Sequence, residues 1–254
     1  YSQQEPRLVT EYALRFKLAS VNEIADSYDH NPNADFHQLV ADMAKIPRSQ
    51  AKVINLGLFY GMGKAKLMAE LGVTKTKADE IFGIYHSKVP FVKQLTNKLM
   101  TAAQRNGKIK TILNRKCRFP KYEPILKGND WGKYIPPQDH ERMLELQAMG
   151  PHMKDDEGEF IVDKDGNKQK NYWHENDSRR AFTYKALNKL IQGSAADMTK
   201  KAMLELYKEG ITPHIQIHDE LDISVTNDLE AAKIKDIMEH AVDLQIPNKV
   251  DYES

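Results

Sequence analysis

The chain has 254 residues, enough for a substantial hydrophobic core in one large domain or two modest ones. Its 37 basic and 36 acidic side chains nearly cancel, so net charge alone indicates no anionic partner. A single cysteine, Cys117, excludes an intrachain disulfide and fits a reducing compartment, and no apolar run approaches the length of a membrane span.

Both ends of the sequence read like the interior of a longer chain. It opens on YSQQEPR rather than on Met, and it stops in the polar stretch KVDYES without a closing signal. We therefore expect a piece of a larger protein.

Apolar residues recur at helical spacing over much of the chain. Residues 1–11 have no clear period, and Asn31-Pro32-Asn33 interrupts the first helical stretch. Helices are predicted at residues 12–21, 35–45, 64–72, 75–85, 91–105, 184–208 and 229–242. Residues 108–120 look extended.

A further helix is predicted after Pro47, which stands where the first turn of a helix tolerates proline. At about 100° per residue, one face of this helix carries two cations, an amide and two apolar side chains: Arg48, Lys52, Asn55, Leu56 and Phe59. Such a face can grip a polyphosphate at one end and pack a sugar or base at the other. Taken alone, the pattern favours an ordinary amphipathic helix with a basic edge. Gly61 and Gly63 are expected to end or hinge this helix.

The middle of the chain is strongly basic, because no acidic residue lies between Glu80 and Glu123. The cations in this interval are Lys88, Lys93, Lys98, Arg105, Lys108, Lys110, Arg115, Lys116, Arg118 and Lys121. So many cations without counter-charges predict a surface for a polyanion. The alternative is a solvated helix face that happens to be basic.

Residues 123–180 lose the helical period and are rich in Pro, Gly, Trp and Asp, so we interpret them as an inserted arm. Residues 163–166, with the sequence DKDG, predict the turn of a β-hairpin. The acidic residues at 155–157, 163 and 165 suggest calcium, but the glycine is in the wrong place for an EF-hand loop. A solvated acidic loop is the better interpretation.

The predicted helix at 184–208 has a face with two amides, Asn188 and Gln192, beside the small residues Ala195 and Ala196. Amides one turn apart can reach the minor groove of DNA. They can equally be packing polar groups near a helix end.

The stretch HIQIHDELDISV, residues 214–225, alternates apolar and polar side chains on both sides of a tight turn, which predicts two short half-buried strands. Asp219 and Glu220 stand at this turn. Two carboxylates on a stiff hairpin suit Mg²⁺, which shares its remaining positions with substrate phosphates. For so short a pattern alone, an acidic turn without function is the simpler interpretation. The helix at 229–242 is expected to cover the back of the hairpin.

Taken in order, these patterns resemble the motifs of the DNA polymerase I family, family A of the DNA polymerases, and most closely its bacteriophage members. Residues 1–7 match D-Y-S-Q-x-E-x-R except for the leading aspartate. The motif R-x3-K-x2-N with a downstream Tyr-Gly is matched by Arg48, Lys52, Asn55, Tyr60 and Gly61. The motif N-x3-Q-G-[ST]-A-A-D is matched by residues 188–197, and H-D-E by residues 218–220. Any one of these is weak, but their agreement in this order is specific.

The resemblance covers nearly the whole chain and implies an α+β fold. It implies a right-hand palm, an antiparallel sheet with packed helices, together with mainly helical fingers. The expected divisions are palm at 1–30 and 181–254, fingers at 31–122, and an inserted arm with a β-hairpin at 123–180. The palm would start just after the aspartate of the first motif.

The resemblance also implies template-directed DNA synthesis in phage replication, by nucleotidyl transfer from a dNTP to a primer 3′ hydroxyl with two Mg²⁺ ions. Asp219 is then the catalytic carboxylate and metal ligand, Glu220 has a lesser catalytic role, and the backbone carbonyl of Tyr1 helps to hold one ion. The implied dNTP-binding residues are Gln3, Glu5 as the gate against ribonucleotides, Arg48 and Lys52 on the triphosphate, Leu56 on the sugar and base, and Tyr60 with Gly61 near the templating base.

The remaining expectations concern partners. The expected primer–template contacts are Asn188, Gln192, His218, Arg115 and Arg118. The other partner is the remainder of the polymerase, a thumb and an exonuclease domain. The location implied is the cytoplasm of the host cell, with no membrane.

Some positions depart from the family pattern. The second metal-binding aspartate would precede Tyr1, so this chain alone is expected to be inactive. Leu56 replaces the Phe or Tyr of better-known relatives, Tyr184 stands where they have a minor-groove arginine, and residues 123–180 are longer than the usual connection. Two alternatives stay open: a catalytically silent DNA-binding subunit descended from a polymerase, and a polymerase that also copies RNA.

Overall fold

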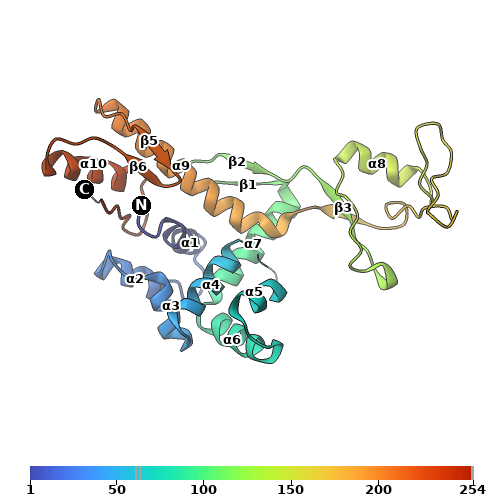
Figure 1. The fold of residues 1–254 in the computed structure, drawn as a ribbon, viewed down its shortest axis with the longest axis horizontal. Helices are drawn as coiled ribbons and strands as arrows, with labels where there is room; N and C mark the ends of the chain where they lie inside the picture. The colour runs from blue at the N-terminus through green and yellow to red at the C-terminus, as the bar shows by residue number, and fades with distance from the viewer. Residues whose placement is uncertain (61, 63, 253–254) are drawn as a thin grey trace. The chain divides into compact units, whose positions relative to one another are not determined.

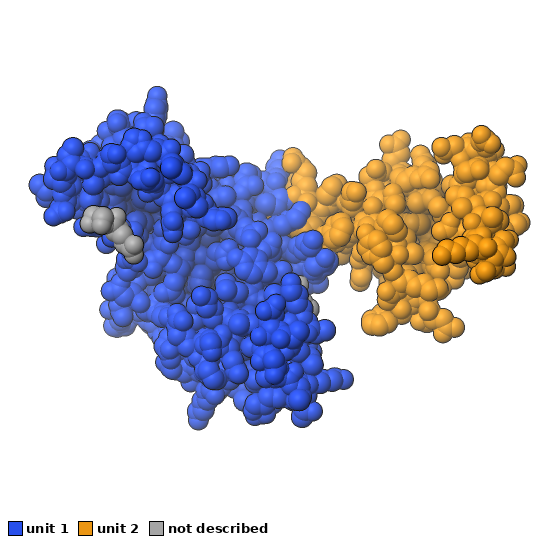
Figure 2. Space-filling model, viewed as in Figure 1, with its two compact units in different colours: residues 1–100, 110–117, 184–254 blue, residues 101–109, 118–183 orange. Residues whose placement is uncertain are grey.

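The computed structural model describes residues 1–60, 62 and 64–252, and it divides into two compact units (Figure 2). Unit 1 comprises Tyr1–Met100, Lys110–Cys117 and Tyr184–Ser254, and unit 2 comprises Thr101–Ile109 and Arg118–Thr183. Each unit combines helices with short antiparallel strands, so the expected α+β class is confirmed. None of the helices among the described residues is both long and apolar enough to cross a lipid bilayer.

Unit 1 is mainly helical (Figure 1). Its helices are α1 (Gln4–Arg15), α2 (Asn22–His30), α3 (Phe36–Ala44), α4 (Arg48–Phe59), α5 (Lys64–Leu71), α6 (Lys75–Lys88), α9 (Ala186–Lys208) and α10 (Asp228–His240), and α7 (Pro90–Asn106) begins there. The predicted helices after residue 34 are confirmed, with ends shifted by a few residues. Side chains that accept backbone N–H groups fix three of the starts: Asp35 for α3, Thr74 for α6 and Asn227 for α10.

The helix predicted at residues 12–21 is wrong in its position. The structure begins α1 at Gln4 and ends it at Arg15, and α2 starts only at Asn22. The helical spacing of buried residues in α1 cannot be recognised from apolar residues alone, because the polar residues Arg7, Thr10 and Glu11 are also buried in this helix. Pattern rules assign such polar side chains to the surface.

Near the hairpin, the core of unit 1 forms around helix α9, which packs against both α1 and α10. The hydroxyl of Tyr12 lies 2.6 Å from Oγ of Ser194, which links α1 to α9. The buried cluster between α9 and α10 consists of Ala202, Leu206, Ile234, Met238, Ala241 and Val250. Leu221 and Ile223 pack against this cluster, so the expectation that the last helix covers one side of the hairpin is confirmed.

The predicted hairpin is present as β5 (Ile215–Ile217) and β6 (Glu220–Asp222), which pair antiparallel with Ile217 opposite Glu220. The turn is formed by residues 218 and 219, and His218 adopts a left-handed conformation with φ 53°. The expectation of half-buried strands is confirmed for β6, where Leu221 is half-buried, and is wrong for β5, where Ile215 and Ile217 are 52% and 58% exposed. Among the described residues no third strand pairs with the hairpin, so only the side toward α10 is covered.

Unit 2 contains most of the predicted arm. Its elements are β3 (Tyr122–Pro124), β4 (Ser178–Arg180), the short 3₁₀ helix η1 (Gly128–Asp130) and α8 (His140–Ala148). Short pairs of strands also include β1 (Lys108–Lys110) with β2 (Lys116–Arg118), and η2 (Thr183–Lys185) precedes α9. The statement that helical period is lost at 123–180 is wrong for α8, which buries Met143 and Leu146 against Trp173. The expected hairpin is confirmed by a bridge between Val162 and Lys168 around Gly166, whose φ is 80°.

Candidate active site

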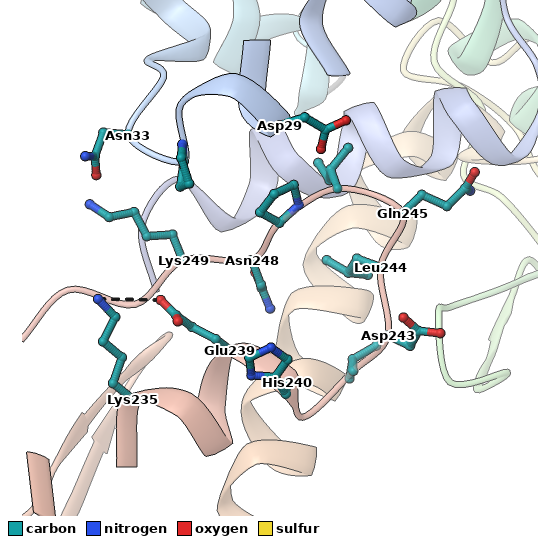
Figure 3. Close-up of a pocket in the computed structure, with 14 residues that line it drawn as sticks. Asp29, Asn33, Lys235, Glu239, His240, Asp243, Leu244, Gln245, Asn248 and Lys249 are labelled. Atoms are coloured by element: carbon teal, nitrogen blue, oxygen red, sulfur yellow. Dashed lines mark ion pairs between the residues drawn. The ribbon is translucent and has the colours of Figure 1, made fainter. Parts of the chain in front are cut away.

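Two of the cavities formed by the described residues of unit 1 are similar in size, and the second contains residues to which the sequence assigns a functional role. The cavity in Figure 3, about 710 Å³, is lined by residues at 29–33 and 235–249, mostly from the segment after α10. The other, about 680 Å³, lies between the start of α1, the end of α4, the middle of α9 and the turn of the hairpin. Its lining residues are Gln3, Gln4, Glu5, Pro6, Tyr60, Gln192, Ala195, Ala196, Thr199, His218 and Asp219.

Gln3 positions the start of α1 at this cavity. Its backbone is left-handed, with φ 52°, and its side chain ties α1 to the start of α3. Nε2 donates to the carbonyl of Ala34 at 3.1 Å, and Oε1 accepts from the backbone of Phe36 at 2.9 Å. Both ends of this amide are therefore engaged within the protein, and its role in dNTP binding stays a prediction.

The structure brings together Glu5 and Tyr60, which lie far apart in the sequence. The Tyr60 hydroxyl donates to both carboxylate oxygens of Glu5, at 3.1 and 2.9 Å. Burial, the hydrogen bond to Glu5 and the charge of Glu5 raise the pKa of Tyr60 to about 12, while a hydrogen bond with Gln192 opposes the shift. Tyr60, which is 41% exposed, thus stays a neutral donor to Glu5 at the cavity.

Asp219 supplies a second carboxylate to the same cavity. Burial raises the pKa of Glu5, the hydrogen bond from Tyr60 lowers it, and the charge of Asp219 raises it further. The two carboxylates therefore repel each other across the site. A cation placed between them would relieve that repulsion.

Tyr1 lies directly beside Asp219. Its α-amino nitrogen donates to the backbone oxygen of Asp219 at 3.1 Å and is 4.0 Å from Oδ2 of the carboxylate, which is 35% exposed. Glu220 opens β6, is exposed and does not line the cavity.

The oxygen donors at this position are of the type that Mg²⁺ binds, but they are too few to fill its coordination shell. The carboxylate of Asp219 is an oxygen donor of the hard kind that Mg²⁺ prefers, and the carbonyl of the neighbouring Tyr1 is of the same kind. Among the described residues, no group of three His, Cys, Asp or Glu side chains is arranged to hold a metal. A Mg²⁺ ion held here would therefore need water or phosphate oxygens to complete its shell.

Helix α9 forms one wall of the cavity. Gln192, Ala195, Ala196 and Thr199 line it at helical spacing, so the two alanines leave room beside the amide. Asn188, one turn earlier, is half-buried outside the lining.

The predicted DNA-contacting arginines fall in different units. Arg115 is tied to α9, because Nε pairs with Oδ1 of Asp197 and Nη2 donates to the carbonyl of Gly193, each at 2.7 Å. Arg118 belongs to unit 2. Their contacts with primer–template stay predictions.

On α4, the expected five-residue binding face is wrong for two members. Asn55 and Phe59 are buried, and Asn55 accepts a hydrogen bond from the Tyr85 hydroxyl at 2.6 Å. These side chains hold α4 in the core, whereas Arg48 and Lys52 are exposed and Leu56 is half-buried. Gly61 and Gly63, expected to end or hinge this helix, lie outside the described residues.

Arg48, Lys52 and Leu56 follow the helix away from the cavity. With a rise of about 1.5 Å per residue, Leu56 lies roughly 6 Å and Arg48 roughly 18 Å along α4 from Tyr60. A nucleotide lying along this helix can therefore have its base at Tyr60 and its phosphates at the cations.

Sequence reasoning missed Thr199 and Gln4 as cavity residues. Thr199 continues the spacing of Gln192, Ala195 and Ala196, so extending that face by one turn would have found it. Gln4 is buried and its amide donates to the carbonyl of Ala195 at 3.4 Å, a contact that no local signal reveals.

Comparison with known proteins places the chain among DNA polymerases. The profile of DNA polymerase family A matches residues 1–254. A DNA-directed DNA polymerase of Pseudomonas phage M6 is 32% identical over 294 residues, covering 100% of this chain and 36% of that protein. DNA polymerase DpoZ of Acinetobacter phage SH-Ab 15497 is 25% identical, covering 95% of this chain and 35% of that protein.

A solved structure shows the same fold. The POL domain of Pol1 from M. smegmatis, in complex with DNA primer-template and dNTP, has a TM-score of 0.66 at 22% identity and is matched over 99% of this chain and 37% of that one. The chain spans about a third of the length of these relatives. Since the family profile covers every residue and the phage M6 protein aligns with the whole chain, the chain belongs to DNA polymerase family A.

Proposed function

We propose that this chain provides most of the nucleotidyl-transfer site of a DNA-directed DNA polymerase that acts in phage replication. The observation that carries the proposal is the cavity at which Glu5, Tyr60, Gln192, His218 and Asp219 converge from four segments of the chain. The solved relative binds DNA primer-template and dNTP, and the phage M6 relative is a DNA-directed DNA polymerase. These support the same ligands here.

In this site Asp219 and the Tyr1 carbonyl would hold Mg²⁺, together with the aspartate expected before Tyr1. Two bound Mg²⁺ ions supply activation of the primer 3′ hydroxyl and charge neutralisation at the leaving pyrophosphate. The protein's own groups orient the reactants: Arg48 and Lys52 bind the triphosphate, and Leu56 packs on the sugar. Glu5, fixed by Tyr60, occupies the space beside C2′ and excludes a ribose hydroxyl.

The template side of the site is formed by α9 and the hairpin turn. Gln192 and His218, with Asn188 one turn away, would contact the primer–template near its terminus, and Arg115 and Arg118 would bind phosphates. We propose palm at 1–30 and 181–254, fingers at 31–122 and an inserted arm at 123–180. The thumb belongs to the remainder of the protein, and the place of action is the cytoplasm of the host cell.

The decisive experiment is primer extension by the complete polymerase and its Asp219→Ala variant over a range of Mg²⁺ concentrations. Loss of the ligand should reduce incorporation by at least about a thousandfold, since the metal supplies most of the charge stabilisation. Primer–template binding should persist, because the cations remain. Turnover like that of the unmodified enzyme would refute the metal assignment, and an unmodified enzyme that binds but never extends would identify a silent DNA-binding subunit.

A further inference from the structure

A loop of unit 2, residues 127–134, displays two aromatic rings to solvent. Trp131 and Tyr134 are each 78% exposed. Within the part of the chain that the structure describes, no ring or cation stacks on either of them. Two large rings three residues apart, both open on their faces, form a surface that can accept planar ligands.

The loop is braced rather than loose. Asp130 accepts from Nζ of Lys133 at 2.7 Å and from Nζ of Lys170 at 2.6 Å, and Lys133 also donates to the Tyr172 hydroxyl at 3.1 Å. Backbone hydrogen bonds close successive turns, including one from Trp131 to Gly128 at 3.1 Å. The backbone that carries the rings is therefore ordered in advance, which reduces the entropy lost when a ligand binds.

The charges around the rings suit a polyanion. Lys127 and Lys133 lie in the loop itself, and Lys133 shares the acid Asp130 with Lys170. The adjoining segments of unit 2, residues 101–109 and 118–122, carry Arg105, Lys108, Arg118 and Lys121 and no acid. Of the thirteen acidic residues of unit 2, six lie at 155–165, and Glu175 is close enough to act on Lys170.

We propose that Trp131 and Tyr134, with Lys127 and Lys133, form a binding site for single-stranded DNA, the rings stacking on bases and the lysines contacting phosphates. Stacking needs open base faces, which a duplex hides, so the ligand is the single strand. A protein partner that buried the rings would also bury the lysines around them, at a cost that a phosphate backbone avoids. The inference extends the proposed function, because the template ahead of the primer terminus is such a strand.

The test compares primer–templates with short and long single-stranded 5′ overhangs, bound to the complete polymerase at equilibrium. The longer overhang should bind more tightly, and Trp131→Ala/Tyr134→Ala should remove that gain, on the order of tenfold or more, without changing affinity for the short overhang. Trp131→Phe/Tyr134→Phe keeps both rings and should keep the gain. Tyr207→Ala, which removes a 69% exposed ring of α9, is the matched control and should change nothing.

Two further variants make the test more specific. Lys127→Ala should reduce the salt dependence of the gain by roughly 0.7 in the log–log slope. Asp219→Ala should retain the whole gain while losing incorporation, which separates this proposal from the proposed function. The proposal is overturned if the double alanine variant keeps the gain, if it weakens both overhangs equally, or if its only effect is lower thermal stability, since the rings then pack on protein.

Discussion

The guanidinium of Arg48 is already occupied by a carboxylate. Its Nε and Nη2 lie 2.7 and 2.5 Å from Oδ2 of Asp35. Burial opposes ionisation of Asp35, but hydrogen bonds from Arg48 and from the backbone of Gln38 and His37 outweigh it, so the pKa of this carboxyl lies below its usual value. The pair thus adds stability above the unfolded-state pKa, near 3.9, and loses it as the pH falls through the lower folded-state pKa. A triphosphate that binds Arg48 through these two nitrogens has to compete with Asp35.

Asp35→Asn should therefore strengthen dNTP binding. The amide oxygen can still cap α3, while the charge that competes for Arg48 is gone. We expect the KM for dNTP to fall several-fold with kcat little changed, and stability to change by no more than about 1 kcal/mol, because the pair is exposed. Asp42→Asn makes the same charge change on α3 and serves as the control. An unchanged KM would mean that Asp35 does not compete with the nucleotide.

We predict that Leu56 makes the complete polymerase discriminate against chain terminators. It is half-buried on α4, one turn before Tyr60, and it has no polar atom to replace a missing 3′ hydroxyl. A dideoxynucleotide should leave a buried polar group without a partner, which costs about 1–3 kcal/mol, or roughly ten- to a hundredfold in selectivity.

Leu56→Tyr should relax this discrimination, measured as the ratio of kcat/KM for deoxy- over dideoxynucleotides in the complete enzyme. Leu56→Phe supplies the ring without the hydroxyl and should keep the ratio high. Equal ratios for Leu56 and Tyr would show that this side chain does not face the sugar.

At the scale of the element, the position of α1 in the fold depends on one buried arginine. Arg7 is 1% exposed, and its guanidinium donates to three backbone carbonyls. These belong to Ser2 at 3.0 Å, Pro247 at 2.6 Å and Pro32 at 2.5 Å, and the ring of Tyr28 lies 4.3 Å from its Cζ. A single side chain thereby joins α1 to the loop before α3 and to the C-terminal segment.

Arg7→Ala should lower the free energy of unfolding by about 3–5 kcal/mol, because it leaves buried carbonyls unpaired and opens a cavity. Arg7→Lys should recover only part of this, since one ammonium cannot match the fork geometry. Urea unfolding is the measurement, with Arg142→Ala as the control, since both partners of its ion pair with Glu145 are exposed. A loss below about 1 kcal/mol would contradict the role of Arg7.

The elements also show which features a sequence can reveal. Helices with local signals are predictable, as the caps Asp35 and Asn227 illustrate. The cavity residues Glu5 and Asp219 are recognisable because short motifs carry them. The start of α1 is not, because burial of Arg7 depends on a partner 240 positions away, at Pro247. The exposure of the hairpin is equally invisible, since it depends on which neighbours pair with it.

At the scale of the molecule, each unit has a core of its own. In unit 2 that core is small, and Trp173, 3% exposed, packs in it with Met143 and Leu146. Trp173→Ala should therefore destabilise unit 2 by about 3–5 kcal/mol. Hydrogen exchange in the complete polymerase should quicken in α8 and leave α9 and α10 unchanged. Trp131→Ala, which removes an exposed tryptophan, should leave exchange in α8 as it was, and faster exchange in both units would indicate one cooperative structure.

The hairpin that carries Asp219 is only three residue pairs long and is covered on one side. A two-stranded ribbon of this size is barely stable by itself, so its geometry depends on Leu221 and Ile223 against α10 and on the hydrogen bond from Tyr1. A divalent cation that binds only the ordered turn must then also stabilise the ribbon. A change that weakens the folding of this ribbon should therefore also weaken the binding of such a cation at Asp219, because the two equilibria are coupled.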